Sequence, residues 1–368
     1  MSEAVRTLIV GAGPIGIETA VRLQQRGVDA LVVDAGEIGA TFGWWAPSTR
    51  FFSSPERLAI CGVPIVTADQ GKCTGEQYRD YLRSVVQQFG VDVRTFTRVV
   101  AIDRTADGFA VGLATSAHGV GGPAEDARGA QADRAERTID VANVVLAIGN
   151  MHRARTIGVA GEHLPHVSHY LEDPHRYFGR RVLIVGAKNS AVEAAIRLFR
   201  AGAHVTMSYR GEAFDSKRVK YWLKPEIEWL IKQGHIEWQP HTVPVEITTG
   251  SVTLAGYDTH SGKMTDARST VEADDVLLLT GYAQDQSLFE TLGITCEGSA
   301  ARPVHDAATM ETNVPGVFVA GTACAGDMTR ATHFIENCHV HAERIAAAIA
   351  GERAHDADTV TYGVMEES

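Results

Sequence analysis

The arrangement of apolar and polar positions repeats once along the chain. One copy begins at Thr7 and the other at Val182. Each contains an apolar β-branched run, a glycine turn, an amphipathic stretch with small residues on one face, and a second apolar run. This is the strand–helix–strand order of a dinucleotide-binding unit. The repetition predicts an α/β protein that binds two nucleotides.

The pattern elsewhere predicts further strands and two longer helices. A helix is expected over 75–89, and another that begins near 332 and ends at 350. Strands are expected over 109–115 and 138–149, and the segment between them is rich in Gly, Ala and charged residues, which is typical of a long hairpin loop. The last residues, from 352 on, form a polar tail.

The first glycine turn has the GxGxxG spacing of a dinucleotide fingerprint. Gly11 is expected to make the tight turn, Gly13 to let the backbone approach a pyrophosphate, and Gly16 to let helix and strand pack closely. The phosphates would lie at the helix N-terminus, where unpaired N–H groups favour anions. Asp34 ends the second strand, 18 residues after Gly16, where a carboxylate accepts hydrogen bonds from the ribose hydroxyls. The neighbouring residues expected to line this site are Pro14, Ile15 and Ala35.

The second glycine turn departs from this spacing at two positions. Lys188 stands at the middle glycine position and Ala191 at the third. Alanine still permits close packing of helix on strand, and the lysine side chain must point away from the turn while adding positive charge. Approach of a phosphate here therefore relies on Gly186, Asn189 and Ser190.

The ribose end of the second copy favours NADPH over NADH. Counting from the first glycine, the position of Asp34 corresponds to Tyr209, which Arg210 follows. An aspartate would repel a 2′-phosphate, whereas an arginine can pair with it through two hydrogen bonds. Lys217 and Arg218 are close enough in sequence to contribute, and they fit a solvated basic face equally well.

The amino-acid composition says more about the kinds of partner that the protein can bind than about its fold. The chain has 368 residues with 34 basic and 45 acidic side chains, a formal net charge of −11, and 45% hydrophobic residues. The hydrophobic fraction excludes global disorder, and the acidic balance gives nucleic acid and anionic membranes little electrostatic attraction. Apolar runs fall short of the roughly 20 residues that cross a bilayer, and the first residues lack the features of a signal peptide. We expect a cytoplasmic protein that acts on small molecules, without nucleic acid or membrane partners.

The cysteines exclude two further classes of protein. There are five, at wide spacings and with no CxxC motif. A disulfide scaffold or a zinc module is therefore not predicted, and neither is any other metal site. Cysteines in such a chain are mostly small buried apolar residues.

The pairing of an Asp-ended site with an Arg-ended site resembles the low-molecular-weight thioredoxin reductase type of flavoprotein. The resemblance covers nearly the whole chain and includes the strand ends VLAIG (145–149) and LLLTG (277–281) and the stretch NVPGVFVAG (313–321). It implies FAD in the first site and NADPH in the second, in two Rossmann-like three-layer β/β/α domains, with the NADPH domain inserted in the FAD domain. The expected boundaries are 1–159 and 291–351 for the FAD domain, 160–290 for the NADPH domain and 352–368 for the tail.

Within that superfamily the chain is similar to the bacillithiol-disulfide reductase-like family. The similarity rests on stretches such as FFSSPERLAICGVPI, KNSAVEAA and FIEN. Ile15 stands where members of this family have a cysteine in the first fingerprint. The segment that matches the redox cysteine pair of thioredoxin reductase is HVSHYLED (166–173), which contains no cysteine. The resemblance also implies a homo-oligomer, either a dimer or a tetramer.

Two residues are candidates for chemistry beyond the transfer of hydride from NADPH to FAD. Cys324 follows Gly321 by three residues, and a redox role would require a lowered thiol pKa. His333, near the start of the last helix, could donate a proton or gate the flavin, although most such histidines are ordinary hydrogen-bonded residues. The other positions expected to bind cofactor are Trp44, Trp45, Val100, Ala147, Gly149, Gly281, Tyr282, Ala320, Gly321 and Thr332.

Three functions remain open at this point. The first is an FAD-dependent, NADPH-oxidising reductase of a disulfide or another small acceptor. The second is a single-component flavin monooxygenase, in which reduced flavin reacts with oxygen; the HVSHY segment superficially resembles the monooxygenase motif at that place. The third is an electron-transfer module like the ferredoxin–NADP reductases that lack redox cysteines, although the acidic net charge is unfavourable for an acidic ferredoxin.

Overall fold

The computed structural model describes residues 3–116, 134–151, 153–327 and 332–354. By their contacts these residues form two compact units. The first unit contains the residues up to 44, residues 48–153, and the described residues from 282 on; the second contains residues 45–47 and 154–281. Most of the expected hairpin loop between 115 and 137, and most of the expected polar tail, lie outside the described residues.

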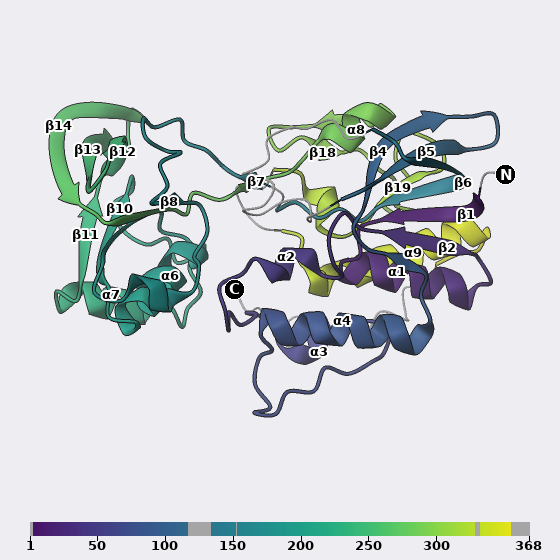
Figure 1. Ribbon diagram of the computed structural model, residues 1–368, viewed down its shortest axis with the longest axis horizontal. Coiled ribbons are helices and arrows are strands. Elements are labelled where there is room, and N and C mark those ends of the chain that lie inside the picture. The colour runs from purple at the N-terminus through teal and green to yellow at the C-terminus, as the bar shows by residue number, and fades with distance from the viewer. Residues whose placement is uncertain (1–2, 117–133, 152, 328–331, 355–368) are drawn as a thin grey trace. The chain divides into compact units, whose positions relative to one another are not determined.

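A parallel sheet forms the centre of the first unit. Its strands are β1 (Glu3–Val10), β2 (Ala30–Val33), β3 (Val93–Arg94), β6 (Arg137–Leu146) and β19 (Val317–Val319). They lie in the order β3-β2-β1-β6-β19, and the last four are labelled in Figure 1. An antiparallel hairpin of β4 (Thr97–Arg104) and β5 (Phe109–Thr115) pairs with the first half of β6. The apolar runs of β1 and β6 are almost completely buried, because both faces of these strands are covered.

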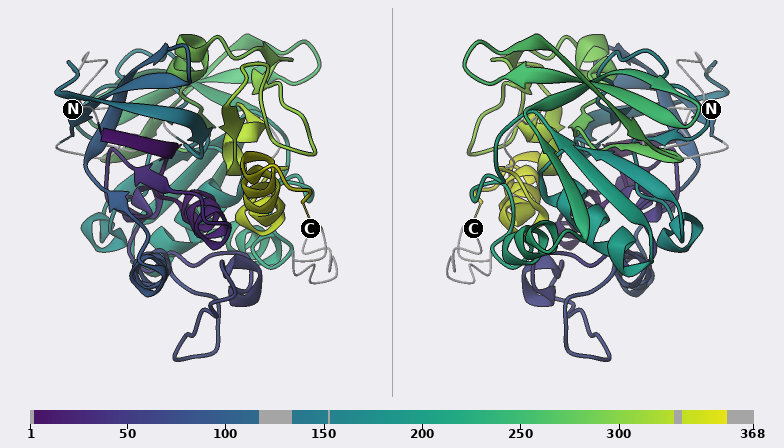
Figure 2. Two further views of the ribbon diagram at one scale, coloured as in Figure 1. Left: turned by 90° about the vertical axis from the view of Figure 1, so that its right-hand side faces the viewer. Right: turned by 90° about the vertical axis from the view of Figure 1, so that its left-hand side faces the viewer.

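Helices cover one face of this sheet. They include α1 (Pro14–Gln25) and α9 (Ile335–Ala350), which lie side by side below the strands (Figures 1 and 2). The helix expected over 75–89 is α4 (Gly75–Phe89), in agreement with the prediction. The last helix begins later than expected, because Phe334 is extended and the Asn337 side chain accepts its N–H at 2.8 Å. The smaller elements are α2 (Ala40–Gly43), α3 (Pro55–Leu58), α8 (Ser287–Leu292), η2 (Gly321–Ala325), β7 (Arg153–Ala154), β16 (Tyr282–Ala283), β17 (Cys296–Glu297) and β18 (Arg302–Pro303).

The second unit repeats the same parallel order in five strands. They are β8 (Val167–Ser168), β9 (Arg181–Val185), β10 (His204–Tyr209), β11 (Ile236–Pro240) and β15 (Asp275–Leu278). Their order is β11-β10-β9-β15-β8. The helices α6 (Asn189–Arg200) and α7 (Lys224–Lys232) and the short η1 (Pro174–Tyr177) contribute to the apolar core on one side of this sheet. An antiparallel sheet of β12 (Thr242–Thr248), β13 (Ser251–Asp258) and β14 (Lys263–Glu272) contributes to the core on the other side (Figure 1).

The fold class expected from the repeat is confirmed. Each unit has a parallel sheet with a strand order that reverses beside the first strand of its βαβ unit, as in dinucleotide-binding folds. The second unit has the three-layer β/β/α arrangement, and its main part is an insertion between two segments of the first. The periodic pattern identified the units because a buried parallel strand is a nearly continuous apolar run. No helix in the described part of the chain is both long and apolar enough to span a membrane.

Candidate dinucleotide sites

The first glycine turn joins β1 to α1 and is held by backbone contacts on two sides. Gly11 has a φ of +114°, and a Cβ there would lie 2.4 Å from the Ala147 carbonyl oxygen, so this position requires glycine. A Cβ on Gly16 would lie 2.0 Å from the Gly11 oxygen. Gly13 is different: it caps α1 with an ordinary extended backbone, and nothing lies within 4 Å of a Cβ built there. The open space therefore lies at the helix N-terminus, where a pyrophosphate fits.

Asp34 closes the turn from the end of β2. Its carboxylate accepts the Ala12 N–H at 2.7 Å and the Gly36 N–H at 2.8 Å. Burial raises the pKa of Asp34, and these two backbone hydrogen bonds act in the opposite direction. Each carboxylate oxygen still has a second lone pair for a ribose hydroxyl. Ala35, the next residue, is buried.

Two backbone carbonyls that follow β6 and β19 are bridged by one side chain. The buried amide of Gln284 donates to the Gly149 oxygen at 2.9 Å and to the Ala323 oxygen at 3.0 Å. Gly321 begins η2 and lies against Ile15: a Cβ on Gly321 would lie 3.3 Å from the Ile15 Cβ. Ile15 is therefore a core residue that supports η2. Nothing in the sequence pattern indicated the role of Gln284.

The histidines of this region have different environments. His333 lies beside Thr332, whose hydroxyl is 3.0 Å from its Nδ1, and burial, with Arg302 and His305, lowers its pKa. His341 on α9 is buried, its Nδ1 accepts the Gly321 N–H at 3.1 Å, and burial lowers its pKa to about 3. Both imidazoles are therefore neutral near pH 7. His341 has a structural role in holding η2.

None of the five cysteines, all within the described residues, has the environment of a reactive thiolate. Cys324 is 2% exposed, its thiol lies 3.9 Å from the His341 Nδ1, and burial, with Cys338 nearby, raises its pKa. Cys338 is fully buried, and burial raises its pKa to about 12. A redox cysteine requires the opposite shift, so the two buried thiols behave as core residues.

The aromatic residues that follow the first βαβ unit, which include the expected cofactor residues Trp44 and Trp45, divide into two groups. Phe42 and Phe51 pack on Tyr78 in the first unit, with ring centroids 5.2 Å and 4.8 Å from the Tyr78 ring. These three rings pack against one another within the first unit. Trp44 packs on Tyr282 at 5.5 Å, whereas Trp45 is grouped with the second unit. Val100, also expected at the cofactor, is the bulged residue of β4 between the paired residues Val99 and Ala101.

The second glycine turn has the same backbone plan as the first. Gly186 has a φ of +135°, and a Cβ there would lie 2.5 Å from the Leu279 carbonyl oxygen. Lys188 caps α6 with an extended backbone, so a residue other than glycine fits without strain. Ala191 is fully buried, Asn189 accepts the Lys220 N–H at 2.9 Å, and Ser190 is exposed. Gly281, expected at the nucleotide, follows β15, and its carbonyl accepts the Arg155 N–H at 2.9 Å.

Four cationic side chains gather at this turn. Desolvation lowers the pKa of Lys188, and the positive charges of Arg218, Arg155 and Arg210 lower it further. Arg210 follows β10 and is exposed, whereas Arg218 is paired with Asp215 at 3.2 Å. Mutual repulsion of cations is unfavourable in the free protein and is relieved by a bound dianion. Arg155 was not among the residues expected from the sequence, because no local motif marks it.

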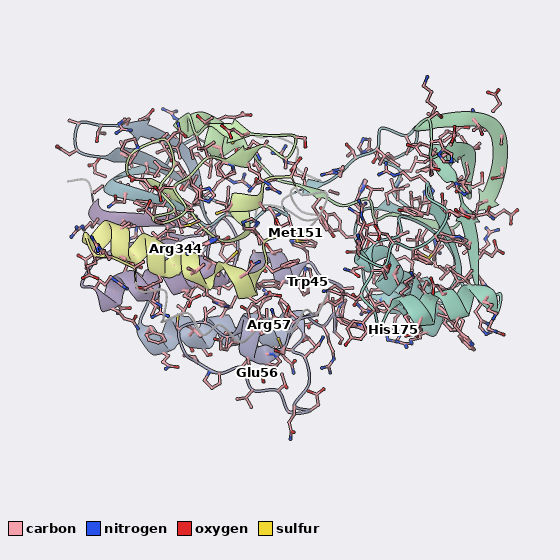
Figure 3. All side chains as sticks on the ribbon, turned by 180° about the vertical axis from the view of Figure 1, so that it is seen from behind. Trp45, Glu56, Arg57, Met151, His175 and Arg344 are labelled. Atoms are coloured by element: carbon pink, nitrogen blue, oxygen red, sulfur yellow. The ribbon has the colours of Figure 1, made fainter. Side chains whose placement is uncertain are left out.

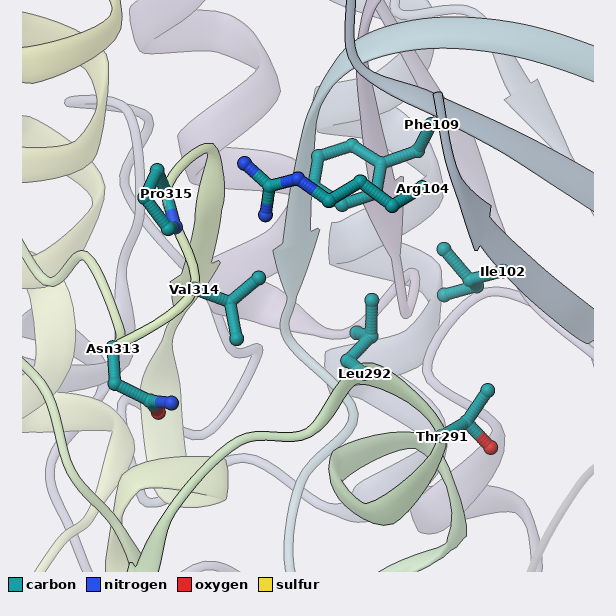
Figure 4. Close-up of a pocket in the computed structure, with 8 residues that line it drawn as sticks. All are labelled: Ile102, Arg104, Phe109, Thr291, Leu292, Asn313, Val314 and Pro315. Atoms are coloured by element: carbon teal, nitrogen blue, oxygen red, sulfur yellow. The ribbon is translucent and has the colours of Figure 1, made fainter. Parts of the chain in front are cut away.

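A small surface pocket of the first unit lies away from that unit's glycine turn. It has a volume of about 250 Å³ and is lined by the ends of the β4–β5 hairpin, by α8 and by the segment before β19 (Figure 4). The pocket therefore lies near the amino end of β19. The glycine turn lies at the opposite end of the parallel strands, after the carboxyl end of β1. No group of three or more potential metal ligands occurs among the described residues.

Two Rossmann-like units with glycine turns of this kind define a two-nucleotide oxidoreductase. The model of the pyridine nucleotide-disulphide oxidoreductase family matches residues 8–118 and 125–321, and the chain belongs to this family. Membership implies that it uses FAD and NADP(H).

Relatives of known identity extend this assignment. Bacilliredoxin reductase Bdr of Bacillus subtilis is 33% identical over 350 residues, which are 95% of this chain and 99% of that protein. The structure of bacillithiol disulfide reductase Bdr from Bacillus cereus is 31% identical, with a TM-score of 0.83, over 95% of this chain and 99% of that one. A ferredoxin–NADP reductase of Ignicoccus hospitalis is 27% identical over 85% of this chain and 88% of that protein. The likeness to the disulfide reductase family expected from sequence motifs is confirmed.

Proposed function

We propose that this protein is an NADPH-dependent flavoenzyme that reduces a small disulfide or a related acceptor without a cysteine pair of its own. For a disulfide, the balanced reaction consumes one NADPH and one proton and yields NADP⁺ and two thiols. The observation that carries the proposal is the difference between the two ribose ends, Asp34 in the first unit and Arg210 among other cations in the second. The bound FAD would supply two-electron chemistry by accepting hydride and passing both electrons on.

The first unit is assigned the FAD. Its turn would hold the pyrophosphate over Gly13, where a Cβ meets no other atom, and Asp34 would accept the ribose hydroxyls. The carbonyls that Gln284 holds together would border the flavin ring. The amino end of α9 supplies partial positive charge that stabilises an anionic reduced ring.

The second unit is assigned the NADPH. The charges of Arg155, Arg210 and Arg218 all act on Lys188 and lower its pKa, and a 2′-phosphate is the feature of NADPH that this concentration of positive charge would attract. The boundaries of this domain, 160 and 290, stay a prediction, as do the individual contacts to the dinucleotide.

The acceptor would have to take electrons from the flavin itself. A thiol relay through Cys324 is unfavourable, because its pKa is raised and its side chain is buried. Ile15 closes the alternative position in the glycine turn with a buried aliphatic side chain. His333, neutral near pH 7, is the candidate that would hold a proton for the acceptor at Nε2, because its Nδ1 lies 3.0 Å from the Thr332 hydroxyl.

Rapid mixing tests the overall function. The enzyme is purified with its flavin, reduced anaerobically with one equivalent of NADPH, and mixed separately with a low-molecular-weight disulfide, with oxygen and with reducible ferredoxin. The proposal requires flavin reoxidation to be fastest with the disulfide and to release two thiols per NADPH. Reoxidation by oxygen with product hydroxylation would identify a monooxygenase, and preferential reoxidation by ferredoxin would identify an electron-transfer module.

A single substitution tests the NADPH assignment. Arg210→Ala should raise the KM for NADPH at least about tenfold and leave the KM for NADH within about twofold, because only NADPH carries the 2′-phosphate. Lys217→Ala, a change in a neighbouring exposed lysine, is the matched control and should alter neither. An unchanged KM for NADPH in the Arg210 variant would show that another residue recognises the phosphate.

We also propose that the partner is a small molecule and that the protein works in the cytoplasm as a homo-oligomer. All five cysteines are free, which suits a reducing compartment. Light scattering coupled to size-exclusion chromatography would report the oligomeric state.

A further inference from the structure

A histidine that the proposed function does not use, His169, directly follows the fifth strand of the second unit. In the parallel order the first four strands run β11-β10-β9-β15, and β8 completes the sheet beside β15. The pairs Val276–Val167 and Leu277–Ser168 fix the register of β8 on β15, and Leu278 pairs with Val185 on β9. Continued by one residue, this register puts His169 in the same row as Leu278 and Val185, just below the second glycine turn.

The strand order indicates which half of a bound dinucleotide would lie near His169. The strand order reverses between β9 and β15, and a dinucleotide lies across that point at the carboxyl ends of the strands. Arg210, after β10, marks the adenosine side. The nicotinamide half therefore extends over β15 and β8, and His169 stands two strand spacings, about 10 Å, from β9 on that side. The corresponding fifth strand of the first unit, β19, leads into Gly321, which is assigned to the flavin.

The His169 side chain is held by a buried carboxylate. Glu162 is 4% exposed, and its two oxygens accept the N–H groups of Ile157 at 2.9 Å and Gly158 at 2.7 Å. Its Oε1 also lies 3.5 Å from the His169 Nε2. Because a carboxylate only accepts hydrogen bonds, this contact favours the tautomer that carries its proton on Nε2.

The other ring nitrogen is left as an acceptor. The His169 side chain is 13% exposed, and its Nδ1 is buried with no hydrogen-bond partner in the described part of the chain. Buried polar atoms are normally paired, so an isolated one at a ligand-binding edge points to a group absent from the free protein. The turn that carries it is ordered, because the Ser168 hydroxyl donates to the Tyr170 carbonyl at 2.9 Å and accepts its N–H at 3.1 Å.

We propose that His169 binds the carboxamide of the nicotinamide, with its Nδ1 accepting a hydrogen bond from the carboxamide N–H₂, and that Glu162 is the positioning residue that fixes the imidazole. The inference rests on the proposed function, since it requires NADP(H) in the second unit. It adds a specificity for the amide: an analogue with a carboxylate in its place offers no donor to Nδ1 and brings a negative charge toward Glu162.

Binding measurements separate this contact from the rest of the dinucleotide. Calorimetric titration of the flavin-loaded protein gives dissociation constants for NADP⁺, for 2′,5′-ADP, which lacks the nicotinamide, and for the carboxylate analogue of NADP⁺. The variants are His169→Ala, His169→Asn, which restores an acceptor, and His166→Ala. His166 is the matched control because it precedes β8, at the opposite edge of the sheet, and contacts the Thr248 carbonyl at 3.1 Å.

The expected result is a loss confined to the nicotinamide. His169→Ala should weaken NADP⁺ binding about fivefold, the value of one hydrogen bond, without changing 2′,5′-ADP binding. It should also reduce the discrimination against the carboxylate analogue to the part that repulsion by Glu162 causes, and His169→Asn should recover most of the NADP⁺ affinity. His166→Ala should change nothing.

Other results overturn the inference. Equal weakening of NADP⁺ and 2′,5′-ADP in the His169→Ala variant would mean that the residue only supports the fold, and no change in either would mean that the nicotinamide lies elsewhere. If the unmodified protein binds neither ligand, the NADPH assignment itself is wrong and this inference is wrong with it.

Discussion

The two glycine turns share one backbone geometry but differ in the residues at their middle and third positions. Gly11 and Gly186 both have positive φ and both meet the carbonyl of a neighbouring strand, at 2.4 Å and 2.5 Å from a Cβ built on them. The middle residues, Gly13 and Lys188, both cap a helix with extended backbone that any residue can adopt. The first position is therefore fixed by backbone geometry, whereas the middle position is free to follow the ligand. A glycine there leaves room for a pyrophosphate, and a lysine would add charge for the NADPH that we propose for the second unit.

The third position should show the largest effect of this difference. Gly16→Ala should destabilise the first unit by about 3 kcal/mol, because a Cβ there lies 2.0 Å from the Gly11 oxygen and the backbone must move. The reciprocal Ala191→Gly should cost only about 1–2 kcal/mol, from a lost buried methyl and a more flexible helix. Urea denaturation followed by circular dichroism measures both. Equal costs would mean that the two turns have the same packing at this position.

The features of the fold and of the two turns that depend on a local sequence pattern could be predicted from the sequence. The repeat, the glycines and Asp34 are local signals, and the helix over 75–89 has a Thr74 cap and an amphipathic face. Arg155, Gln284 and His169 were not found as site residues, because each is brought to its site by a strand order that no local pattern encodes. In particular, β8 has only two residues and precedes β9 in the chain. It therefore lies outside the repeated strand–helix–strand pattern, and that pattern does not predict it as a fifth strand.

The helices that follow the two turns also differ in how they are covered. The apolar residues of α6 pack into the core of the second unit, and those of α1 and α9 pack into the core of the first. In addition, α1 and α9 are joined by buried charges. His339 on α9 lies 2.7 Å from the Glu18 carboxylate and 3.0 Å from the carbonyl of Arg57 on α3, which is labelled in Figure 3. Burial alone would lower the pKa of His339, but the hydrogen bond and charge of Glu18 outweigh it and the pKa is raised.

Removing this imidazolium should have the next largest effect. His339→Gln should destabilise the protein by about 2 kcal/mol at pH 6, because the buried Glu18 loses its nearest cation and keeps Arg22 at 3.9 Å. Since the folded-state pKa lies above the unfolded value of about 6.5, the contribution is complete below that pH and is lost as pH rises through the folded-state pKa. Urea denaturation at a series of pH values should give a smaller difference between variant and unmodified protein at pH 9 than at pH 6. A difference independent of pH would mean that His339 is neutral.

The middle position of the first turn should affect the ligand and not the fold. Gly13→Ala should weaken FAD binding about tenfold and leave the stability of the apoprotein within about 0.5 kcal/mol, because the Cβ enters space that is open in the protein. Fluorescence titration of the apoprotein with FAD measures the first quantity and urea denaturation the second. A large loss of apoprotein stability would show that the helix cap itself requires glycine.

The middle position of the second turn should give the smallest change, and its pH dependence identifies the cause. Lys188→Met should weaken NADP⁺ binding about fivefold at pH 7, a loss typical of one partly solvated charge. Desolvation and the neighbouring guanidinium groups hold the pKa of Lys188 below 10.5, and a bound phosphate would raise it again. Binding above the lowered pKa must therefore take up a proton, so the affinity of the unmodified protein should fall as pH rises toward 10.

In the Lys188→Met variant the part of this decline that is due to Lys188 should vanish, whereas the Lys217→Met variant should retain it. If the decline persists unchanged in the Lys188 variant, the ammonium does not contact the phosphate, and the lysine has no part in the NADPH recognition that we propose for Arg210.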